Sequence, residues 1–244
     1  MSPIFTGKWF SNSSIDRFEV DPYFSSVTAL LHFDNSWVDN SSYNLTINRF
    51  NNPILSTTTF KYGSGSAYTN STGSAFGQIY WTMPSAFGTR SFTIEMWINP
   101  LLTYTDTNAS IFTLRPAGGS WDLGLIRDGT SSDPMKFSLI VNTTPQTSPT
   151  YVTVISASTS TQIAFGVWSH IAVVRSGNTY TLYINGVNSG SGTSSYSLTG
   201  TSCYLARDSS GARKLNSYFD DVRITTVARY ASDFTVPPRA FPNQ

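Results

Sequence analysis

The sequence of 244 residues contains a single cysteine and few charged side chains. Cys203 has no second cysteine to pair with, so no internal disulfide and no cysteine metal cluster can form. Only 12% of the residues are charged, and the 15 Lys and Arg are spread along the chain against 14 Asp and Glu. Because a nucleic-acid-binding surface needs clustered positive charge, we expect no nucleic acid as partner.

Long apolar runs are also missing from the sequence. No stretch approaches the roughly 18 consecutive apolar residues that a membrane helix needs, so we expect no membrane insertion. Disorder is excluded, because 39% of the residues are hydrophobic and 14% are aromatic, which is enough to bury a core. A chain of this length and composition is typical of one all-β domain.

Helix signals are nearly absent, whereas β-branched and aromatic residues alternate with Ser, Thr and Asn. In residues 91–99 every second residue from Phe92 to Ile98 is apolar, which predicts a strand that ends at Pro100. Runs 168–175 and 179–187 predict a hairpin, and Asn185-Gly186 predicts a type I′ turn into a third strand. A dozen such strands predict a two-sheet antiparallel β-sandwich. The other predicted strands are 27–33, 44–50, 78–83, 110–114, 121–127, 136–142, 151–157, 202–206 and 218–225.

The two ends differ from the middle. Residues 1–26 carry aromatic side chains without alternation, and we interpret them as an extended N-terminal arm ahead of a domain spanning 27–244. The arm docks either on its own domain or on another subunit or larger assembly. Residues 236–242 are stiffened by proline and are expected to lie along the surface, and the Gly/Ser-rich stretches 63–66 and 189–195 are interpreted as loops. The aromatic residues expected to anchor the arm are Phe5, Trp9, Phe10, Phe18, Tyr23 and Phe24.

Three runs, residues 92–100, 168–186 and 218–224, resemble in order and spacing the laminin-G-like, concanavalin A-like jelly-roll superfamily. Residues 29–34 and 228–237 resemble the subgroup common in virion proteins of tailed bacteriophages. The resemblance covers close to the whole chain and implies a concanavalin A-like jelly roll. The resemblance does not indicate which function the chain has, because that superfamily includes lectins, glycosidases, adhesion domains and virion proteins.

A catalytic pair of carboxylates is not apparent in the sequence. The glucanase relatives place two carboxylates on alternate residues of one strand, but Glu95 is followed at that spacing by Trp97. Asp220 and Asp221 are adjacent, which in a strand points them to opposite faces. A serine or cysteine nucleophile needs an imidazole, and both histidines lie in apolar runs and are interpreted as structural. These are His32 and His170. We therefore expect no catalytic residues and no enzyme.

Asp220 is the most informative carboxylate. By alternation it shares a face with Val222 and Ile224 that should point into the core, where an ionised group needs hydrogen bonds or a cation. One interpretation is a structural aspartate that holds a loop or an arginine such as Arg223 or Arg229. The other is a structural calcium site, which related jelly rolls often carry and which loop carbonyls would complete. The candidate calcium ligands are Asp34, Asp39, Asp220 and Asp221.

Sugars are recognised by aromatic faces that stack on the pyranose ring beside amides and carboxylates. The sequence has enough Trp and Tyr for such a platform, although most aromatic residues of a sandwich fill its core. The candidate carbohydrate-binding residues are Tyr80, Trp81, Trp97, Trp121 and Tyr183.

Two functional hypotheses follow, and they are compatible. The first is a non-enzymatic virion protein that is displayed on a phage capsid or tail, as a decoration or fibre-type protein. Its N-terminal arm would anchor it, and its partners would be other virion proteins. The alternative is a lectin-like module that binds host-surface glycans. A homo-oligomer is expected on a symmetric particle, with monomer, dimer and trimer all open.

Overall fold

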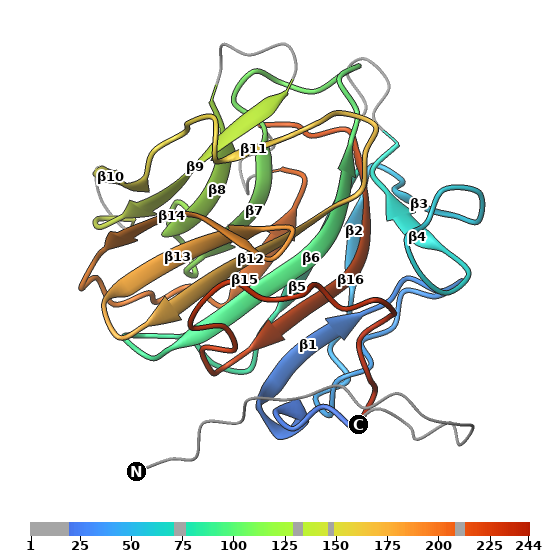
Figure 1. Cartoon of the computed structure of the whole chain (residues 1–244), viewed down its shortest axis with the longest axis horizontal. Coiled ribbons are helices and arrows are strands. Elements are labelled where there is room, and N and C mark those ends of the chain that lie inside the picture. Colours follow the sequence, from blue (N-terminus) through green and yellow to red (C-terminus); the bar gives the residue numbers. More distant parts are fainter. Residues whose placement is uncertain (1–19, 71–76, 129–133, 146–148, 208–212) are drawn as a thin grey trace.

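Two antiparallel sheets lie face to face, which confirms the predicted all-β sandwich (Figure 1). The computed structural model describes residues 20–70, 77–128, 134–145, 149–207 and 213–244. In these residues the helical content is one turn of 3-10 helix, η1 (Phe24–Ser26), and no helix there is long and apolar enough to cross a membrane.

Sheet A has eight strands and contains the three-stranded meander predicted from residues 168–187. Asn185 and Gly186 have φ values of 50° and 81°, as the predicted type I′ turn requires. The strand order is β14 (Val187–Thr193), β13 (Thr179–Ile184), β12 (Ser169–Ser176), β6 (Phe92–Pro100), β16 (Ser217–Thr225), β4 (Ser66–Tyr68) and β3 (Ile54–Ser56), with β1 (Val27–Leu31) also paired to β16.

Sheet B also has eight strands, and all its pairings are antiparallel. The strand order is β10 (Tyr151–Ile155), β9 (Met135–Asn142), β8 (Leu123–Arg127), β7 (Ser110–Arg115), β15 (Ser202–Leu205), β5 (Gln78–Thr82) and β2 (Asn48–Phe50), with β11 (Gln162–Ile163) also paired to β9.

The core lies between the two sheets and is formed by the inward residues of each strand. The alternation predicted for β6 is confirmed, because Phe92, Ile94, Met96 and Ile98 all belong to this core. Each such side chain stabilises the fold by about 1.5–3 kcal/mol relative to full exposure. The outward residues of β6 are buried as well, since a second layer covers them.

That second layer is the C-terminal segment, residues 226–244, whose dark red trace crosses sheet A in Figure 1. Phe234 donates its N–H to the carbonyl of Gly186 at 2.9 Å, and Tyr230 and Phe234 pack against Tyr183 of β13. The proline-rich tail therefore lies along the surface, as predicted. The N–H of Asp21 bonds to the carbonyl of Gln244 at 2.7 Å, so the packed part of the chain begins before the expected boundary at residue 27.

The prediction that residues 189–195 form a loop was wrong, because most of them belong to strand β14. Their small side chains have a packing reason. A Cβ atom on Gly192 would lie 1.9 Å from the carbonyl oxygen of Val154 in β10, and one on Gly190 would lie 2.7 Å from Ile155. Gly192 therefore allows an edge of sheet A to approach an edge of sheet B.

A bulge in β16 changes which face its acidic residues occupy. Asp220 pairs with Trp97, but Arg223 pairs with Glu95, so β16 has one extra residue over this stretch. Asp221 takes the left-handed conformation within the bulge, with φ 45°. The simple alternation predicted for Asp220 and Asp221 was therefore wrong, and both carboxylates point to the outer face of sheet A.

Candidate functional site

A cluster of buried ion pairs lies between β6, β16 and the C-terminal segment. Glu95 accepts hydrogen bonds from Arg223 Nε at 2.9 Å and from the Tyr230 hydroxyl at 2.8 Å. Asp21 accepts hydrogen bonds from Arg223 Nη1 at 3.1 Å and from Arg229 Nη2 at 2.6 Å. Two carboxylates and two guanidinium groups therefore balance in charge away from solvent.

The electrostatics of Glu95 are those of a structural anion. Its burial favours the neutral form, but Arg223, His170 and Arg229 outweigh that effect and lower its pKa to about 2. Glu95 is 0% exposed, so its carboxylate is closed to solvent. His170 is also fully buried, with its Nε2 3.4 Å from Glu95 Oε2, as expected of a structural histidine.

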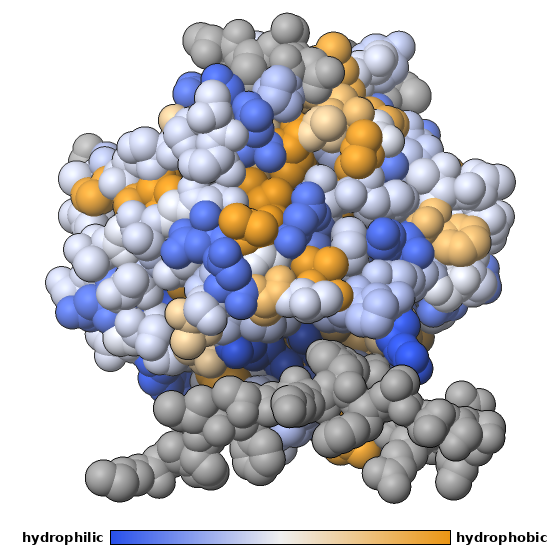
Figure 2. All heavy atoms as spheres, in the orientation of Figure 1, coloured by the Kyte–Doolittle hydropathy of each residue, from blue (hydrophilic) through white to orange (hydrophobic). Residues whose placement is uncertain are grey.

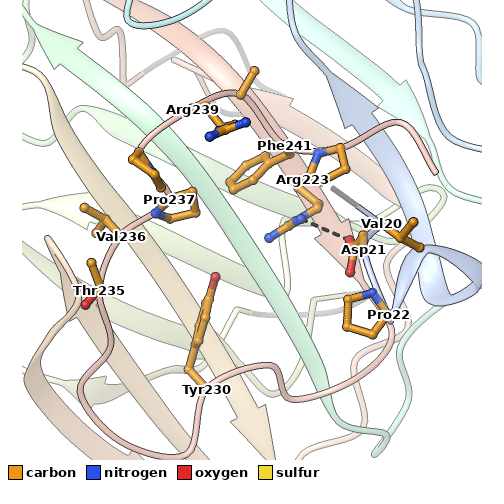
Figure 3. A pocket seen from close by; sticks show the side chains of 13 residues that line it. Val20, Asp21, Pro22, Arg223, Tyr230, Thr235, Val236, Pro237, Arg239 and Phe241 are labelled. Carbon is orange, nitrogen blue, oxygen red and sulfur yellow. Dashed lines mark hydrogen bonds and ion pairs between the residues drawn. The ribbon is translucent and has the colours of Figure 1, made fainter. Parts of the chain in front are cut away.

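A cavity of about 700 Å³ opens beside this cluster, between residues 20–22 and 235–242 (Figure 3). Arg223 and Tyr230 point into it, and the Arg223 guanidinium lies 3.7 Å from the centre of the Phe241 ring. Its walls are mainly Val, Ala and Pro side chains, and its volume is in the range of small-ligand sites. Because Arg223 is already paired with carboxylates, the cavity offers mostly apolar contacts. In Figure 2, patches of apolar residues alternate with hydrophilic ones across the same face.

The two carboxylates of the bulge hold loops in place. Asp220 accepts hydrogen bonds from the backbone N–H groups of Lys61 and Tyr62, at 2.7 and 3.0 Å, which agrees with the interpretation of a structural aspartate holding a loop. Burial raises the pKa of Asp220 to about 7, and the negative charge of Asp221 acts in the same direction. The two backbone hydrogen bonds lower the pKa but do not outweigh these effects. Asp221 accepts the Phe241 N–H at 2.9 Å and pairs with His32, which directly follows β1.

The structure does not bring the four candidate calcium ligands together. Each carboxylate accepts backbone N–H bonds in its own place, and no group of three or more His, Cys, Asp or Glu suited to a metal occurs among the described residues. Asp34 accepts the N–H of Gly65 at 3.1 Å, and Asp39 accepts the N–H of Leu30 at 2.8 Å. Backbone donors occupy the oxygens that a cation would need, so the calcium prediction is not supported.

Four of the five aromatic residues predicted to bind sugar are buried. Trp81, 0% exposed, belongs to the core, and Trp97, 4% exposed, lies 4.1 Å beneath the ammonium group of a lysine. Trp121 is 3% exposed and stacks on a tyrosine, and Tyr183 is 2% exposed under the C-terminal segment. None of these four offers a free ring face, so their assignment to a sugar platform was wrong.

Tyr80 is the exception, because it lies half-buried on the outer face of sheet B. Its ring stacks with Tyr204 of β15 at 5.5 Å and an interplanar angle of 18°. In register, Asn48 flanks Tyr80 and Thr113 flanks Tyr204. Sequence reasoning missed Tyr204, although its inward neighbours Cys203 and Leu205 give the alternation that points it outward.

Two of the predicted anchoring residues can be placed. Tyr23 is 44% exposed, with the Arg229 guanidinium 5.2 Å from its ring centre. Phe24 packs against the domain's own Val27, Leu30 and Phe241, as in the interpretation of a terminal tie. The remaining predicted anchors lie outside the described residues; these are Phe5, Trp9, Phe10 and Phe18.

Comparison with known proteins gives one family and several structural neighbours. Residues 73–233 match the model Laminin_G_3, described as the concanavalin A-like lectin/glucanases superfamily. A search of the curated proteins found no match.

Among solved structures, domain 4 of AbnA, an extracellular GH43 arabinanase from Geobacillus stearothermophilus in complex with arabinotriose, matches with a TM-score of 0.62 and 19% identity. The match covers 83% of this chain and 93% of that domain. The botulinum neurotoxin serotype D binding domain matches with a TM-score of 0.63 and 15% identity, over 85% of this chain and 50% of that one. A structure of botulinum neurotoxin type C, whose cell entry depends on two ganglioside molecules, matches with a TM-score of 0.58 and 15% identity, over 85% and 49%. This chain thus spans about half the length of the toxin chains, and these identities show likeness of fold alone.

Proposed function

The chain belongs to the concanavalin A-like lectin/glucanases superfamily, and on that premise we propose that it is a non-enzymatic domain that binds carbohydrate. The observation that carries the proposal is the Tyr80–Tyr204 pair on the outer face of sheet B. Stacked aromatic rings beside an amide are groups that bind a sugar ring and its hydroxyls. Asn48, which pairs with Tyr80 and is partly exposed, is that amide.

The absence of catalysis is part of this proposal. Glu95 is engaged by two arginines and a tyrosine and is closed to solvent. Asp220 and Asp221 are engaged by backbone N–H groups. A glycosidase needs two carboxylates facing the scissile bond, and these three are committed to internal contacts. The arabinotriose complex and the ganglioside dependence of the neighbours support saccharide as the ligand class.

A glycan array probed with the full chain tests the proposal. We expect saturable binding to at least one oligosaccharide, weakened about tenfold or more by Tyr204→Leu, which keeps apolar volume but removes the flat ring. Tyr43→Leu, a change at a 48% exposed tyrosine elsewhere, is the matched control and should bind like the unmodified chain. Saturable binding that Tyr204→Leu leaves unchanged would overturn the site, and release of reducing sugar would overturn the non-enzymatic assignment.

We also propose that the domain is a component of a bacteriophage particle, on the capsid or the tail, attached through residues 1–26. The supporting observation is the apolar cavity at residues 20–22, where the aromatic-rich N-terminal residues join the sandwich. Immunogold labelling of particles made by the encoding genome tests this. Labelling is expected with the full chain and not after deletion of residues 1–19, and the deleted chain should keep its β-sheet circular dichroism. Particles without label, or labelling that survives the deletion, would contradict the proposal.

A further inference from the structure

A second row of aromatic and amide side chains crosses the outer face of sheet A. In register, Ile54 of β3 pairs with Tyr68 of β4, Tyr68 with Tyr218 of β16, and Tyr218 with Asn99 of β6. The neighbouring residues along these strands, among them Phe219, belong to the core, so the row points outward. The row therefore lies on the opposite side of the sandwich from Tyr80 and Tyr204.

The two tyrosines of this row form a closer stack than the pair on sheet B. Their ring centres are 4.4 Å apart, with an interplanar angle of 18°, and both residues are half-buried. Ile54 is 40% exposed at the end of the row. Its aliphatic surface extends the flat apolar surface of the rings, as a platform for the CH face of a sugar requires.

Asn99, at the other end of the row, has an unsatisfied polar atom. Its side chain is 6% exposed, and its Oδ1 has no hydrogen-bond partner. A buried acceptor without a donor costs roughly 1–3 kcal/mol, so such atoms usually have a protein, water or ligand partner. A sugar hydroxyl is a donor of the right size, and it would lie beside the tyrosine rings.

We propose that Tyr68, Tyr218 and Asn99 form a second saccharide-binding site, so that one chain binds two separate saccharides on opposite faces. This inference rests on the proposed function. Neither row contains a charged side chain, so the ligand class is a neutral oligosaccharide. Because packed sheets lie about 10 Å apart and the rows face away from each other, one sugar cannot contact both rows. The domain can therefore cross-link neutral glycan chains.

An oligosaccharide array that includes arabinotriose, probed with the full chain and five variants, tests the inference. We expect Tyr218→Leu and Tyr204→Leu each to leave part of the saturable binding, and the double variant to lose at least tenfold more than either one. Asn99→Leu should weaken the same spots as Tyr218→Leu, and Tyr104→Leu, at a 53% exposed tyrosine, serves as the control. Thermal melting of each variant establishes that it is folded.

The outcomes separate this inference from the proposed function. Binding that Tyr204→Leu abolishes alone, with Tyr218→Leu unchanged, overturns the second site and leaves the first. Binding that Tyr218→Leu abolishes alone, with Tyr204→Leu unchanged, overturns the first site and the claim of two. An unmodified chain that binds no spot overturns both. Calorimetry with the best neutral oligosaccharide should give two sites per chain, and one site per chain would contradict the inference.

Discussion

Replacing Glu95 by glutamine removes one charge from a sealed cluster and keeps its shape. The amide oxygen still accepts from Arg223, but Arg223 and Arg229 then share only Asp21 as counter-charge. The pKa of Glu95 falls from 4.5 to about 2, and each unit is worth about 1.36 kcal/mol. The ionised carboxylate thus contributes about 3 kcal/mol, close to the 3–5 kcal/mol typical of a broken buried ion pair.

The sign of the pH dependence follows from the lowered pKa. The contribution of Glu95 is fully present above its unfolded pKa of 4.5 and is lost as the pH falls towards about 2. We therefore expect Glu95→Gln to lower the free energy of unfolding by about 3 kcal/mol at pH 7. In a domain of this size the melting temperature falls by about 2–4 °C per kcal/mol, or roughly 6–12 °C in total. At pH 2 the two proteins should differ far less.

Urea unfolding of both proteins from pH 7 to pH 2 measures this difference. Asp106→Asn is the control, because Asp106 pairs with Lys214 at 3.7 Å near the surface and such pairs contribute about 0–1 kcal/mol. A loss below 1 kcal/mol at pH 7, or an equal loss at pH 7 and pH 2, would refute the reasoning.

Three further predictions use other parts of the fold. Gly192→Ala should lower stability by about 1–3 kcal/mol or more, because the new Cβ would lie 1.9 Å from the carbonyl oxygen of Val154. Ser191→Ala, at the exposed neighbouring residue, is the control and should change stability little. Equal urea midpoints for the two variants would contradict this. Asp220→Asn should stabilise the protein above pH 7 by up to about 4 kcal/mol and give no gain below pH 4. The pKa of Asp220 is raised from 3.8 to about 7, so its contribution to stability is present below pH 3.8 and is lost as the pH rises through 7. A variant that is less stable than the unmodified chain at pH 8 would count against this. Trp81→Ala should cost about 3–5 kcal/mol because the side chain is fully buried in the core, and a melting temperature within 2 °C of the unmodified chain would disagree.

Much of the fold could be predicted from the sequence because strand alternation is a local signal. The core face of β6 and the turn at Asn185-Gly186 each depend on a few neighbouring residues. Short strands such as β3 (Ile54–Ser56) and β11 (Gln162–Ile163) were not predicted, because two or three residues carry no period. Their pairing is decided by partners distant in the sequence.

The candidate site was harder to predict, because burial of an outward face depends on what covers it. Trp97 alternates as an outward residue, but Lys61 and Tyr62, which are distant in the sequence, pack against its ring, and it is 4% exposed. Alternation with core neighbours points Tyr204 and Tyr218 outward, but the tyrosines on which they stack are known only from the cross-strand register. The bulge at Asp221 is similar, because a single residue with φ 45° reverses the face that alternation assigns.

The contact between Gly192 of β14 and Val154 of β10 has a consequence for crowded surroundings. Both strands are terminal in their sheets, and unpaired strand edges are places where a foreign strand can add and start aggregation. Here each edge obstructs the approach to the other, since a Cβ atom is already too large for the space between them. A Gly/Ser sequence that is weak as a strand former therefore also shields the molecule from self-association when many copies are packed together.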